Sequence, residues 1–501
     1  MEFASPGQIA LALLPEIVLS IWAMLVLLID VFQKADRGGA SSPSIPLLTV
    51  FGVLLTAAAN GWLATAGADG IQTASVAIDG FRIFTNFVLL LALLLFLFIS
   101  QRYLTEEGMR LGELYVLMMF ATVGMMVFAG TRDLMLMFIG LELLSVPVYV
   151  LTGMNRRDIR SAEGALKYFL LGAFSSAFFL LGVALVFGAT GTTNLGGIST
   201  SVGIEGLGAS PLLVVGMVLL AVGFGFKVAA VPFHMWTPDA YEGAPAPIAA
   251  FMAAAVKTAA FAAFLRVFLT GFLGLHETWD IIAIGLGITT MVVANLIALV
   301  QGNVKRMLAY SSVAHAGYLL VALAAASTRG AASFLFYALV YTLMTIGAFA
   351  VVLAVGGRGE ERLDLDAYAG LGWRHPAIGT AMTVFLLSLA GFPLTGGFIG
   401  KVFILGAAVE RGLVLLAIVL VLTSLVSYWY YLRVAWYMWF RSSAAEPAAP
   451  LAMTSAISVA LFLAAAAVVF LGVFPGSLLD LAEASAASLM GATALPGAPV
   501  P

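Results

Sequence analysis

Long apolar runs recur along almost the whole chain, and they constrain its fold more than any other feature. A membrane-spanning helix needs roughly 20 consecutive apolar residues, so these runs predict about fourteen crossings. The runs are continuously apolar instead of alternating, which excludes the strands of a transmembrane β-barrel. We therefore predict an all-α polytopic membrane protein, with spans at about 9–32, 45–66, 80–101, 113–130, 133–152, 163–189, 210–233, 244–271, 279–301, 304–325, 331–356, 376–406, 411–440 and 451–474.

Composition excludes several other classes of protein. Hydrophobic residues make up 62% of the chain and charged residues 10%, whereas a soluble domain carries about 25% charged residues. The net charge is only −3, so no basic surface for nucleic acid is expected. The chain has no cysteine, and its 4 histidines are far apart. We therefore expect no metal site, cluster, haem or other cofactor on this chain.

Lysine and arginine gather in alternate loops, which predicts the orientation. Loops rich in these residues stay on the cytoplasmic side, and an even number of spans then puts both termini on the periplasmic side. The linker at 356–376 would lie on the cytoplasmic surface, with 360–364 as a short interfacial helix. The basic loop residues are Lys34, Arg37, Arg102, Arg110, Arg156, Arg157, Arg160, Lys305, Arg306, Arg358, Arg362, Arg374 and Arg441.

Ionisable side chains inside the apolar runs are the strongest functional signal. Four of the six lysines fall there, although an ionisable group at the bilayer centre costs at least about 2.5–3.5 kcal/mol. Burial and a nearby carboxylate change the proton affinity of a lysine in opposite directions, which suits the loading and unloading of protons. The predicted proton path comprises Glu142, Lys167, Lys227, Lys257, His315 and Lys401.

Each of these side chains also has a structural alternative. Lys167 lies one turn inside its span and could reach the surface by extending its side chain. Glu142 could be the static partner of a lysine, and His315 could merely bridge two helices. Glu16 and Asp30, which bracket the first span, are interpreted as interfacial or packing groups.

Two aromatic clusters near the C-terminal side of the chain are interpreted differently. The residues at 428–431 and 436–439 are rich in tyrosine and tryptophan. Such residues are enriched at membrane–water interfaces. We interpret both clusters as an interfacial belt combined with helix packing, and not as a ligand site.

Two lysines lie beside helix breakers. Lys227 precedes Pro232 in span 7, and Lys401 follows Pro393 in span 12. Proline removes a backbone donor, so freed carbonyls and half-helix ends are expected at both places. Spans 7 and 12 cross in opposite directions, which favours two inverted five-helix repeats, spans 4–8 and 9–13. The expected divisions are an N-terminal three-helix segment at 1–112, a first repeat at 113–271, an inverted repeat at 279–440, and a last helix with a short tail at 441–501.

These residues together resemble the proton-antiporter-type subunits of respiratory complex I, a family similar to multisubunit cation/proton antiporters and membrane-bound hydrogenases. The resemblance rests on Glu142, on Lys227 followed by VPFHMWTPDA at 231–240, on Lys257, and on Lys401 after GFIG at 397–400. The 397–401 ending most resembles the N-type subunits of bacterial NADH-quinone oxidoreductase. M-type subunits have a glutamate where Lys401 stands, and L-type subunits carry a long C-terminal lateral helix in place of the short tail after Phe474.

The resemblance implies a membrane-arm subunit of the bacterial cytoplasmic (inner) membrane. Glu142 and Lys227 would interact near the broken helix, Lys167 would modulate them, Lys257 would be the central relay, and Lys401 would serve the outward half of the path. Energy would come from NADH oxidation and quinone reduction, so FMN, iron–sulfur clusters and quinone belong to other subunits. The implied partners are the M subunit, the small K and J subunits, and lipid.

Three functions remain open on this basis. The first is the N-type subunit, which translocates protons. The second is a subunit of a multisubunit Na+/H+ antiporter without redox coupling, and the third is a non-conducting membrane-arm scaffold. The 397–401 ending and the length favour the first over the second. Span 10 departs from a complete lysine chain, since it offers only His315 and the edge pair Lys305 and Arg306.

Overall fold

The structure is a computed structural model that describes residues 5–36, 44–66, 73–107, 112–204, 210–356, 362–442, 451 and 453–491. Of the loop residues used to predict the orientation, Arg37, Arg110 and Arg358 lie outside the described residues, as does the side chain of Lys34. Within the described ranges the chain is helical, with isolated β-bridges and no strand.

The first half of the chain supplies the first eight crossings. Reading along it, the helices are α1 (Pro6–Ala12), α2 (Leu14–Asp36), α3 (Ile45–Ala66), α4 (Gly80–Glu106), α5 (Gly112–Gly130), α6 (Leu134–Thr152), α7 (Ile159–Thr190), α8 (Leu195–Ile204), α9 (Pro211–Val228), α10 (Trp236–Gly243), α11 (Ala246–Phe251) and α12 (Lys257–Arg266). Two π-helical turns, η2 (Met252–Val256) and η3 (Val267–Gly271), flank α12.

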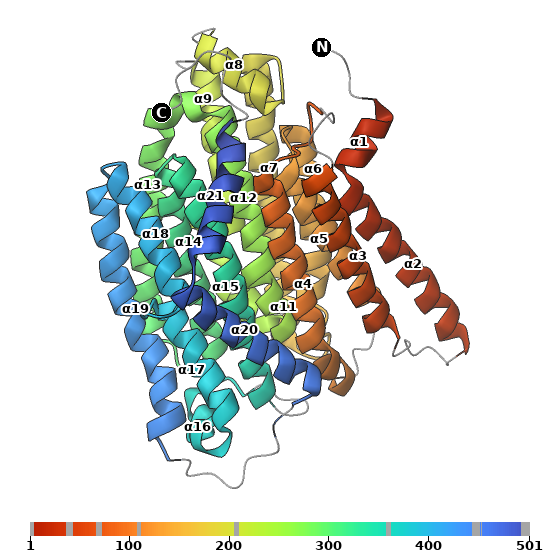
Figure 1. The fold of residues 1–501 in the computed structure, drawn as a ribbon, viewed down its shortest axis with the longest axis vertical. Coiled ribbons are helices and arrows are strands. Elements are labelled where there is room, and N and C mark those ends of the chain that lie inside the picture. The colour runs from red at the N-terminus through yellow and green to blue at the C-terminus, as the bar shows by residue number, and fades with distance from the viewer. Residues whose placement is uncertain are drawn as a thin grey trace.

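The second half supplies the remaining crossings. Its helices are α13 (His276–Leu299), α14 (Val304–Ala324), α15 (Thr328–Val355), α16 (Leu371–Arg374), α17 (Pro376–Ala390), α18 (Gly396–Glu410), α19 (Val414–Phe440), α20 (Ser455–Val473) and α21 (Gly476–Gly491), with 3-10 turns η4 (Leu273–Leu275) and η5 (Leu365–Tyr368). Among the described residues, 13 helical segments are long and apolar enough to cross a membrane. The shorter α17 and α18 follow one another as two halves of a further crossing (Figure 1). The prediction of an all-α polytopic membrane fold is confirmed.

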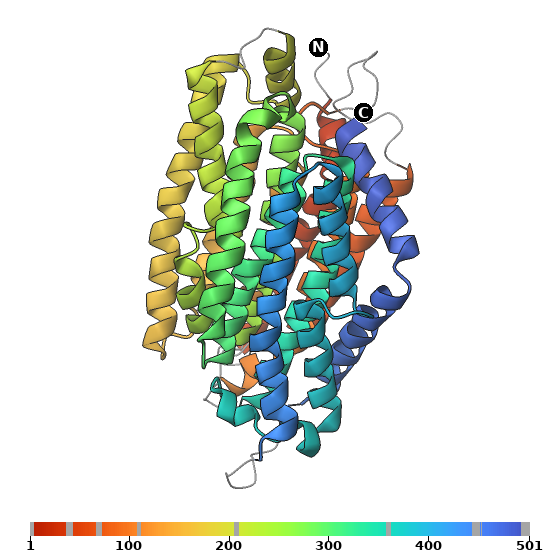
Figure 2. The same ribbon diagram turned by 90° about the vertical axis from the view of Figure 1, so that its left-hand side faces the viewer.

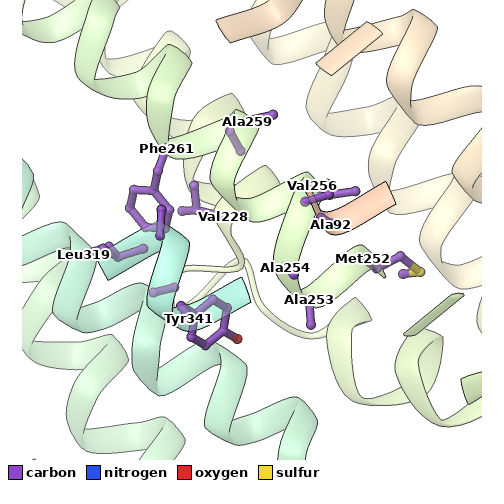
Figure 3. Close-up of a cluster of buried hydrophobic side chains, with 14 of the residues drawn as sticks. Ala92, Val228, Met252, Ala253, Ala254, Val256, Ala259, Phe261, Leu319 and Tyr341 are labelled. Carbon is purple, nitrogen blue, oxygen red and sulfur yellow. The ribbon is translucent and has the colours of Figure 1, made fainter. Parts of the chain in front are cut away.

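The centre of the bundle is formed by helices that touch protein on every side. The stretch Ala246–Gly271 is 100% buried, and α14 and α15 are each 94% buried, whereas α3, α7 and α20 are 33% buried. Figure 3 shows how small residues of η2 and α12, such as Ala254 and Ala259, let neighbouring helices approach, with Ala92, Val228, Leu319 and Tyr341 packed around them. Small residues are the usual means of close helix packing in membranes.

Both predicted helix breaks are present. α9 ends at Val228, and the chain continues through 229–235, which contains Pro232, before α10 begins at Trp236. α17 ends at Ala390, and the segment 391–395, which contains Pro393, leads into α18. In Figure 1, α9 begins at the upper end of the molecule, whereas α17 begins near the lower end and α18 continues upward. The two broken helices therefore run in opposite directions, as predicted.

Two details of the sequence-based prediction are wrong. The segment after Phe474 is not a simple tail, because it contains α21, which bends away from α20 and packs against α4 and α15 (Figure 2). The Oγ atom of Ser488 on α21 accepts a hydrogen bond of 3.3 Å from the Phe81 N–H in the first turn of α4. The interfacial helix predicted at 360–364 falls partly outside the described residues, and its described part is not helical, because the backbone of Leu363 pairs with Val304.

Candidate functional site

The first polar cluster of the interior joins α6, α7 and α9. Glu142, at the middle of α6, accepts a hydrogen bond of 2.5 Å on Oε1 from the Ser176 hydroxyl of α7. Ser145 lies nearly one turn after Glu142 and accepts a hydrogen bond of 2.7 Å from Lys227 Nζ. The hydroxyl of Ser145 itself donates to the Leu141 carbonyl. Glu142 and Lys227 therefore each contact a different serine hydroxyl, and the hydrogen bond of the lysine goes to a hydroxyl and not to the carboxylate.

Lys227 is held at this place by the break in its helix. It lies in the last turn of α9, next to Ala229, whose φ of 61° ends the helix in the left-handed region. The rings of Tyr149 and Tyr168 each lie 5.5 Å from the ammonium. Aromatic faces attract a cation, so both rings support a charged lysine in a site that is otherwise apolar.

The second cluster centres on α14, which lies in the second half of the chain. Lys257, the first residue of α12, donates a hydrogen bond of 2.5 Å to the Ser312 carbonyl and another to the Ser312 hydroxyl. The lysine side chain is buried. Both hydrogen bonds of its amino group therefore go to one residue of α14, Ser312.

His315 connects α14 to two further helices. Its Nδ1 atom lies 2.6 Å from the Tyr337 hydroxyl of α15, and its Nε2 atom lies 3.0 Å from the Tyr431 hydroxyl of α19. Tyr431 also shares a hydrogen bond with the Ser311 hydroxyl. Because neutral imidazole has one donor and one acceptor nitrogen, His315 donates to one tyrosine and accepts from the other.

Lys401 occupies the second helix break. Its Nζ atom donates to the Leu389 and Ala390 carbonyls, at 3.0 and 2.9 Å, which are the last carbonyls of α17. These groups have no partner within α17 because the helix ends there. The ring of Tyr318 lies 4.6 Å from the ammonium. The carbonyl end of one half-helix thus binds the lysine of the other half.

Helix α14 places its polar side chains between Lys257 and Lys401. Ser311, His315 and Tyr318 follow a spacing of i, i+4 and i+7, which lines one face of a helix. The structure therefore brings Lys257, His315 and Lys401 around one helix, and Glu142 with Lys227 into a separate group on α6 and α9. The serine and tyrosine partners of these side chains are absent from the predicted proton path: Ser145, Ser176, Ser312, Tyr337 and Tyr431.

Lys167 lies elsewhere. Its Nζ atom pairs with Glu163 at 2.6 Å and with Asp239 at 2.7 Å, and its side chain is 44% exposed. Arg306 of α14 binds the same Asp239 at 3.2 Å and Glu242 at 2.6 Å. The partners of Lys167 and Arg306 lie at a polar hollow between α7, α10 and α14, which is lined by Arg160, Glu163, Gly164, Asp239, Glu242, Gly243 and Arg306. Lys167 is therefore part of a charged cluster, and its polar contacts are not with Glu142 or Lys227.

A further ion pair precedes α7 at the same end of the molecule. Asp158 caps the helix by accepting from the Arg160 N–H at 3.0 Å and pairs with the Arg160 guanidinium. The hydrogen bond from the Arg160 side chain holds the pKa of Asp158 below its usual range. The negative charge at the helix start also matches the helix dipole.

One side of Glu142 lies at the outer surface of the helix bundle. The residue is only half-buried, and it borders a hollow of about 630 Å³ whose other lining residues are apolar: Leu117, Phe120, Phe138, Ile139, Leu143, Val146 and Pro147. A carboxylate at this depth is costly next to hydrocarbon. The remaining path residues, Lys227, Lys257, His315 and Lys401, are buried.

A separate group of buried charges joins α2, α4 and α12. Glu16 binds Arg82 through both carboxylate oxygens at 2.7 Å, and Arg266 binds Asp79 with bonds of 2.7 and 2.9 Å. Burial alone would raise the pKa of Asp79, but Arg266 opposes this and keeps the pKa below its usual value. Glu16 is thus a buried packing group, in line with its interpretation from sequence.

Both parts of the interpretation of the aromatic cluster at 428–431 are present, and its members divide between exposed positions and helix packing. Tyr430 and Tyr431 are fully buried and hydrogen-bonded, whereas Trp429 is 66% exposed. The helical period explains the difference, because adjacent positions of α19 point in different directions. Tyr431 contacts Ser311 and His315 on the polar face of α14. That polar face, which is visible in sequence, was the signal that a tyrosine from another helix would be needed as its partner.

Metal binding receives no support from the part of the chain that the structure describes. Within those residues, no group of three or more histidine and acidic side chains is arranged to hold a metal ion.

The chain matches known proteins over most of its length. Residues 131–427 match the family described as NADH:quinone oxidoreductase/Mrp antiporter, transmembrane. The chain is 45% identical to NADH-quinone oxidoreductase subunit N of Trichlorobacter lovleyi, over 94% of this chain and 96% of that protein. It is also 43% identical to subunit N 1 of Sorangium cellulosum, over 94% of this chain and 97% of that protein.

Solved structures show the same family resemblance. A chain of respiratory complex I from Thermus thermophilus is 35% identical, with a TM-score of 0.78 and coverage of 94% of this chain and 99% of that one. A chain of the Mrp complex from a Dietzia species, at 18% identity and a TM-score of 0.81, covers 97% of this chain and 98% of that one and shares the fold. Since these matches span both repeats and the N-type ending, the chain belongs to the subunit N group of the NADH:quinone oxidoreductase/Mrp antiporter family.

Proposed function

We propose that the chain translocates protons along a buried axis of Glu142, Lys227, Lys257, His315 and Lys401, as a membrane-arm subunit of NADH:quinone oxidoreductase. One observation supports this proposal above the others. Lys227, Lys257 and Lys401 are buried, and their hydrogen bonds go to serine or backbone oxygens. Among the described residues, none of the three lysines has a carboxylate within ion-pair distance. A static ion pair would satisfy each lysine with a carboxylate, so this arrangement favours proton exchange.

The hydroxyl groups give the axis its chemistry. A serine or tyrosine hydroxyl both donates and accepts, so it can receive a proton from one neighbour while it releases its own to the next. Ser311, Tyr431 and His315 form such a series, and Ser312, the chain neighbour of Ser311, bonds to Lys257. Between Tyr318 and Lys401 the contact is with the ring face, so we propose that water completes the transfer there.

Lys167 has a different role in this proposal. Its pairs with Glu163 and Asp239 lie beside the polar hollow at one end of α7. We propose that this charged cluster is where protons enter from the cytoplasmic side, since the loops rich in arginine and lysine favour a cytoplasmic location for that end of the molecule. Lys167 would then modulate Lys227 through the field of the cluster.

We further propose that the axis continues into a neighbouring subunit. The half-buried Glu142 and the apolar hollow beside it support this, because a membrane helix of a partner would shield the carboxylate from lipid. The expected partners are the M subunit and the small K and J subunits. FMN, iron–sulfur clusters and quinone would lie on other subunits, in the bacterial inner membrane, with both termini of this chain periplasmic.

Proton uptake into inverted membrane vesicles, measured per NADH oxidised, tests the proposed axis. We expect Lys227→Met and Glu142→Gln to leave the complex assembled, as an NADH-stained native gel would report, but to lower the protons moved per NADH. Glu277→Gln is a matched control, because Glu277 is exposed at the start of α13. Unchanged pumping in both axis variants would refute the proposed path and favour a scaffold. Failure of the wild-type protein to migrate with NADH activity on the native gel would favour a subunit of an Na+/H+ antiporter.

A further inference from the structure

The segment that joins α17 to α18 lies against the end of α20. A β-carbon built on Gly472 would come closer than 3.0 Å to the Leu394 carbonyl and to the Thr395 nitrogen. All of these are backbone atoms, so no rotation of a side chain could relieve the overlap. Only a glycine at 472 allows α20 to pack this closely on the segment 391–395.

The presence of glycine here runs against the preference of the helix. Gly472 lies within α20, where glycine costs about 0.5–1 kcal/mol relative to alanine. The rest of this helix is rich in alanine, valine and leucine. The close contact with Leu394 therefore accounts for a residue that the helix itself disfavours.

The contacted segment needs support from outside. Leu394 has a φ of 69°, a backbone conformation that persists in a non-glycine residue only when its surroundings fix it. Its side chain is 67% exposed, so packing of the side chain does not supply this support. Within the segment, the Thr395 hydroxyl donates a bond of 2.6 Å to the Phe392 carbonyl. External support comes from α19 at the start of the segment, where the Tyr428 hydroxyl donates a bond of 2.9 Å to the Gly391 carbonyl, and from the backbone contact with α20 at Leu394 and Thr395.

The same segment begins at the carbonyls that bind Lys401. Leu389 and Ala390 accept the hydrogen bonds of the lysine, and a β-carbon at Gly391 would lie 2.9 Å from the Lys401 Cδ atom. A displacement of 391–395 would therefore move these carbonyls relative to the ammonium. We propose that Gly472 is a positioning residue that fixes the Lys401 site through the 391–395 segment. The proposal rests on the proposed function of Lys401.

A double-mutant cycle tests this assignment. Gly472→Ala, Lys401→Gln and the double variant are compared in the full complex by protons moved per NADH in inverted vesicles. We expect Gly472→Ala to cause a partial loss of pumping, and to cause no further loss when Lys401→Gln is already present. If Gly472→Ala caused only a general structural defect, it would lower pumping by the same factor with Lys401 present and with Lys401→Gln present. Gly476→Ala is the matched control, because a β-carbon there meets open space, and it should pump normally.

The outcomes separate the two proposals. Normal pumping in Lys401→Gln refutes the role of Lys401, and with it the proposed function of this half of the axis. Loss in Lys401→Gln with normal pumping in Gly472→Ala, or additive losses, refutes the role of Gly472 alone. If Gly472→Ala fails to assemble, Leu394→Gly should restore assembly, because glycine lets the segment shift, whereas Leu394→Ala should not. Failure of this rescue also refutes the role of Gly472.

Discussion

Each of the three central lysines obtains its hydrogen bonds from oxygen atoms that carry no net charge. Lys227 contacts a hydroxyl, Lys257 a hydroxyl and a carbonyl, and Lys401 two carbonyls. Such oxygens stabilise an ammonium less strongly than a carboxylate does, and they remain compatible with the neutral amine. Hydrogen-bonding partners that tolerate both protonation states suit a residue that gains and loses a proton in each cycle.

The hydroxyl contact of Lys227 can be tested at Ser145. We expect Ser145→Ala to lower the protons moved per NADH, but less than Lys227→Met, because the lysine remains while its hydroxyl partner is lost. Ser333→Ala is the control, since Ser333 is also buried and its hydroxyl bonds to the Gly330 carbonyl of its own helix. Equal pumping in the two serine variants would argue against a role of the Ser145 hydroxyl in the path.

The tyrosines around His315 give a second test. Tyr431→Phe removes one hydrogen-bond partner from His315 and one from Ser311, and each buried polar group left unpaired costs about 1–3 kcal/mol. We expect lower pumping and a lower unfolding temperature of the purified complex. Tyr437→Phe keeps the ring that contacts Arg441 and should change neither quantity. A fully active Tyr431→Phe complex would exclude this hydroxyl from the path.

Among the elements, α14 shows what sequence could and could not predict. The apolar runs, the two breaks and the buried ionisable residues followed from length, proline and the cost of burial. The polar spacing of Ser311, His315 and Tyr318 is visible in sequence, but their partners Tyr337 and Tyr431 lie on α15 and α19. Pairing between distant helices depends on packing, which helical periodicity in one segment does not encode.

Lys167 and α21 are the other instructive elements. The position of Lys167 one turn inside the predicted span at 163–189 left a core and a surface location open, and the partner that decided between them, Asp239, lies on a different helix. α21 is rich in alanine and serine, so it lacks the hydropathy of a crossing, yet small side chains such as Ser485 allow it to pack closely on Gly80 of α4. Hydropathy therefore misses a short helix whose small, partly polar side chains pack on protein, although it detects the longer apolar helices at the centre of the bundle.

The contact between α5 and α6 positions Glu142 and is open to test. A β-carbon at Gly140 would lie 2.7 Å from the backbone nitrogen of Phe128, so Gly140→Ala should separate the helices. Overpacking of this kind costs about 1–3 kcal/mol, and we expect a lower unfolding temperature. Gly285→Ala, on α13, faces open space and should leave stability unchanged or slightly improved. Wild-type stability of Gly140→Ala would show that the interface adapts.

At the scale of the whole molecule, buried ion pairs hold the N-terminal helices to the centre of the bundle. Glu16 of α2 binds Arg82 of α4, and Asp79, which caps α4, binds Arg266 of α12. α12 also carries Lys257, so the N-terminal segment and the proton axis share one helix. Removal of one partner from such a pair leaves an uncompensated buried charge.

Arg266 provides the corresponding prediction. We expect Arg266→Met to destabilise the protein by up to about 3–5 kcal/mol, because buried Asp79 loses its two short bonds and keeps the longer 3.6 Å contact with Arg132. Adding Asp79→Asn should recover part of this loss, since the charge is then removed. Unfolding temperatures of the purified complexes measure both effects. Equal stability of the single and double variants would show that the charge of Asp79 is not the cause.

Acidification should act on the same pair. The pKa of Asp79 is lower in the folded protein than its usual value, so its contribution to stability is complete above about pH 3.9 and is lost as the pH falls further. We expect the unfolding temperature to drop over that range, and to drop less in Asp79→Asn. The same pH dependence in both proteins would assign the loss to other carboxylates.

The contacts made by α20 and α21 also form late in the synthesis of the subunit. These two helices follow every other described helix in the chain, so the ribosome makes them last. Until α20 is inserted, the segment 391–395 lacks its contact with Gly472, and until α21 folds, the first turn of α4 lacks Ser488. From the synthesis of Lys401 until α20 is in place, the nascent subunit therefore lacks the contact that supports the segment beside this lysine.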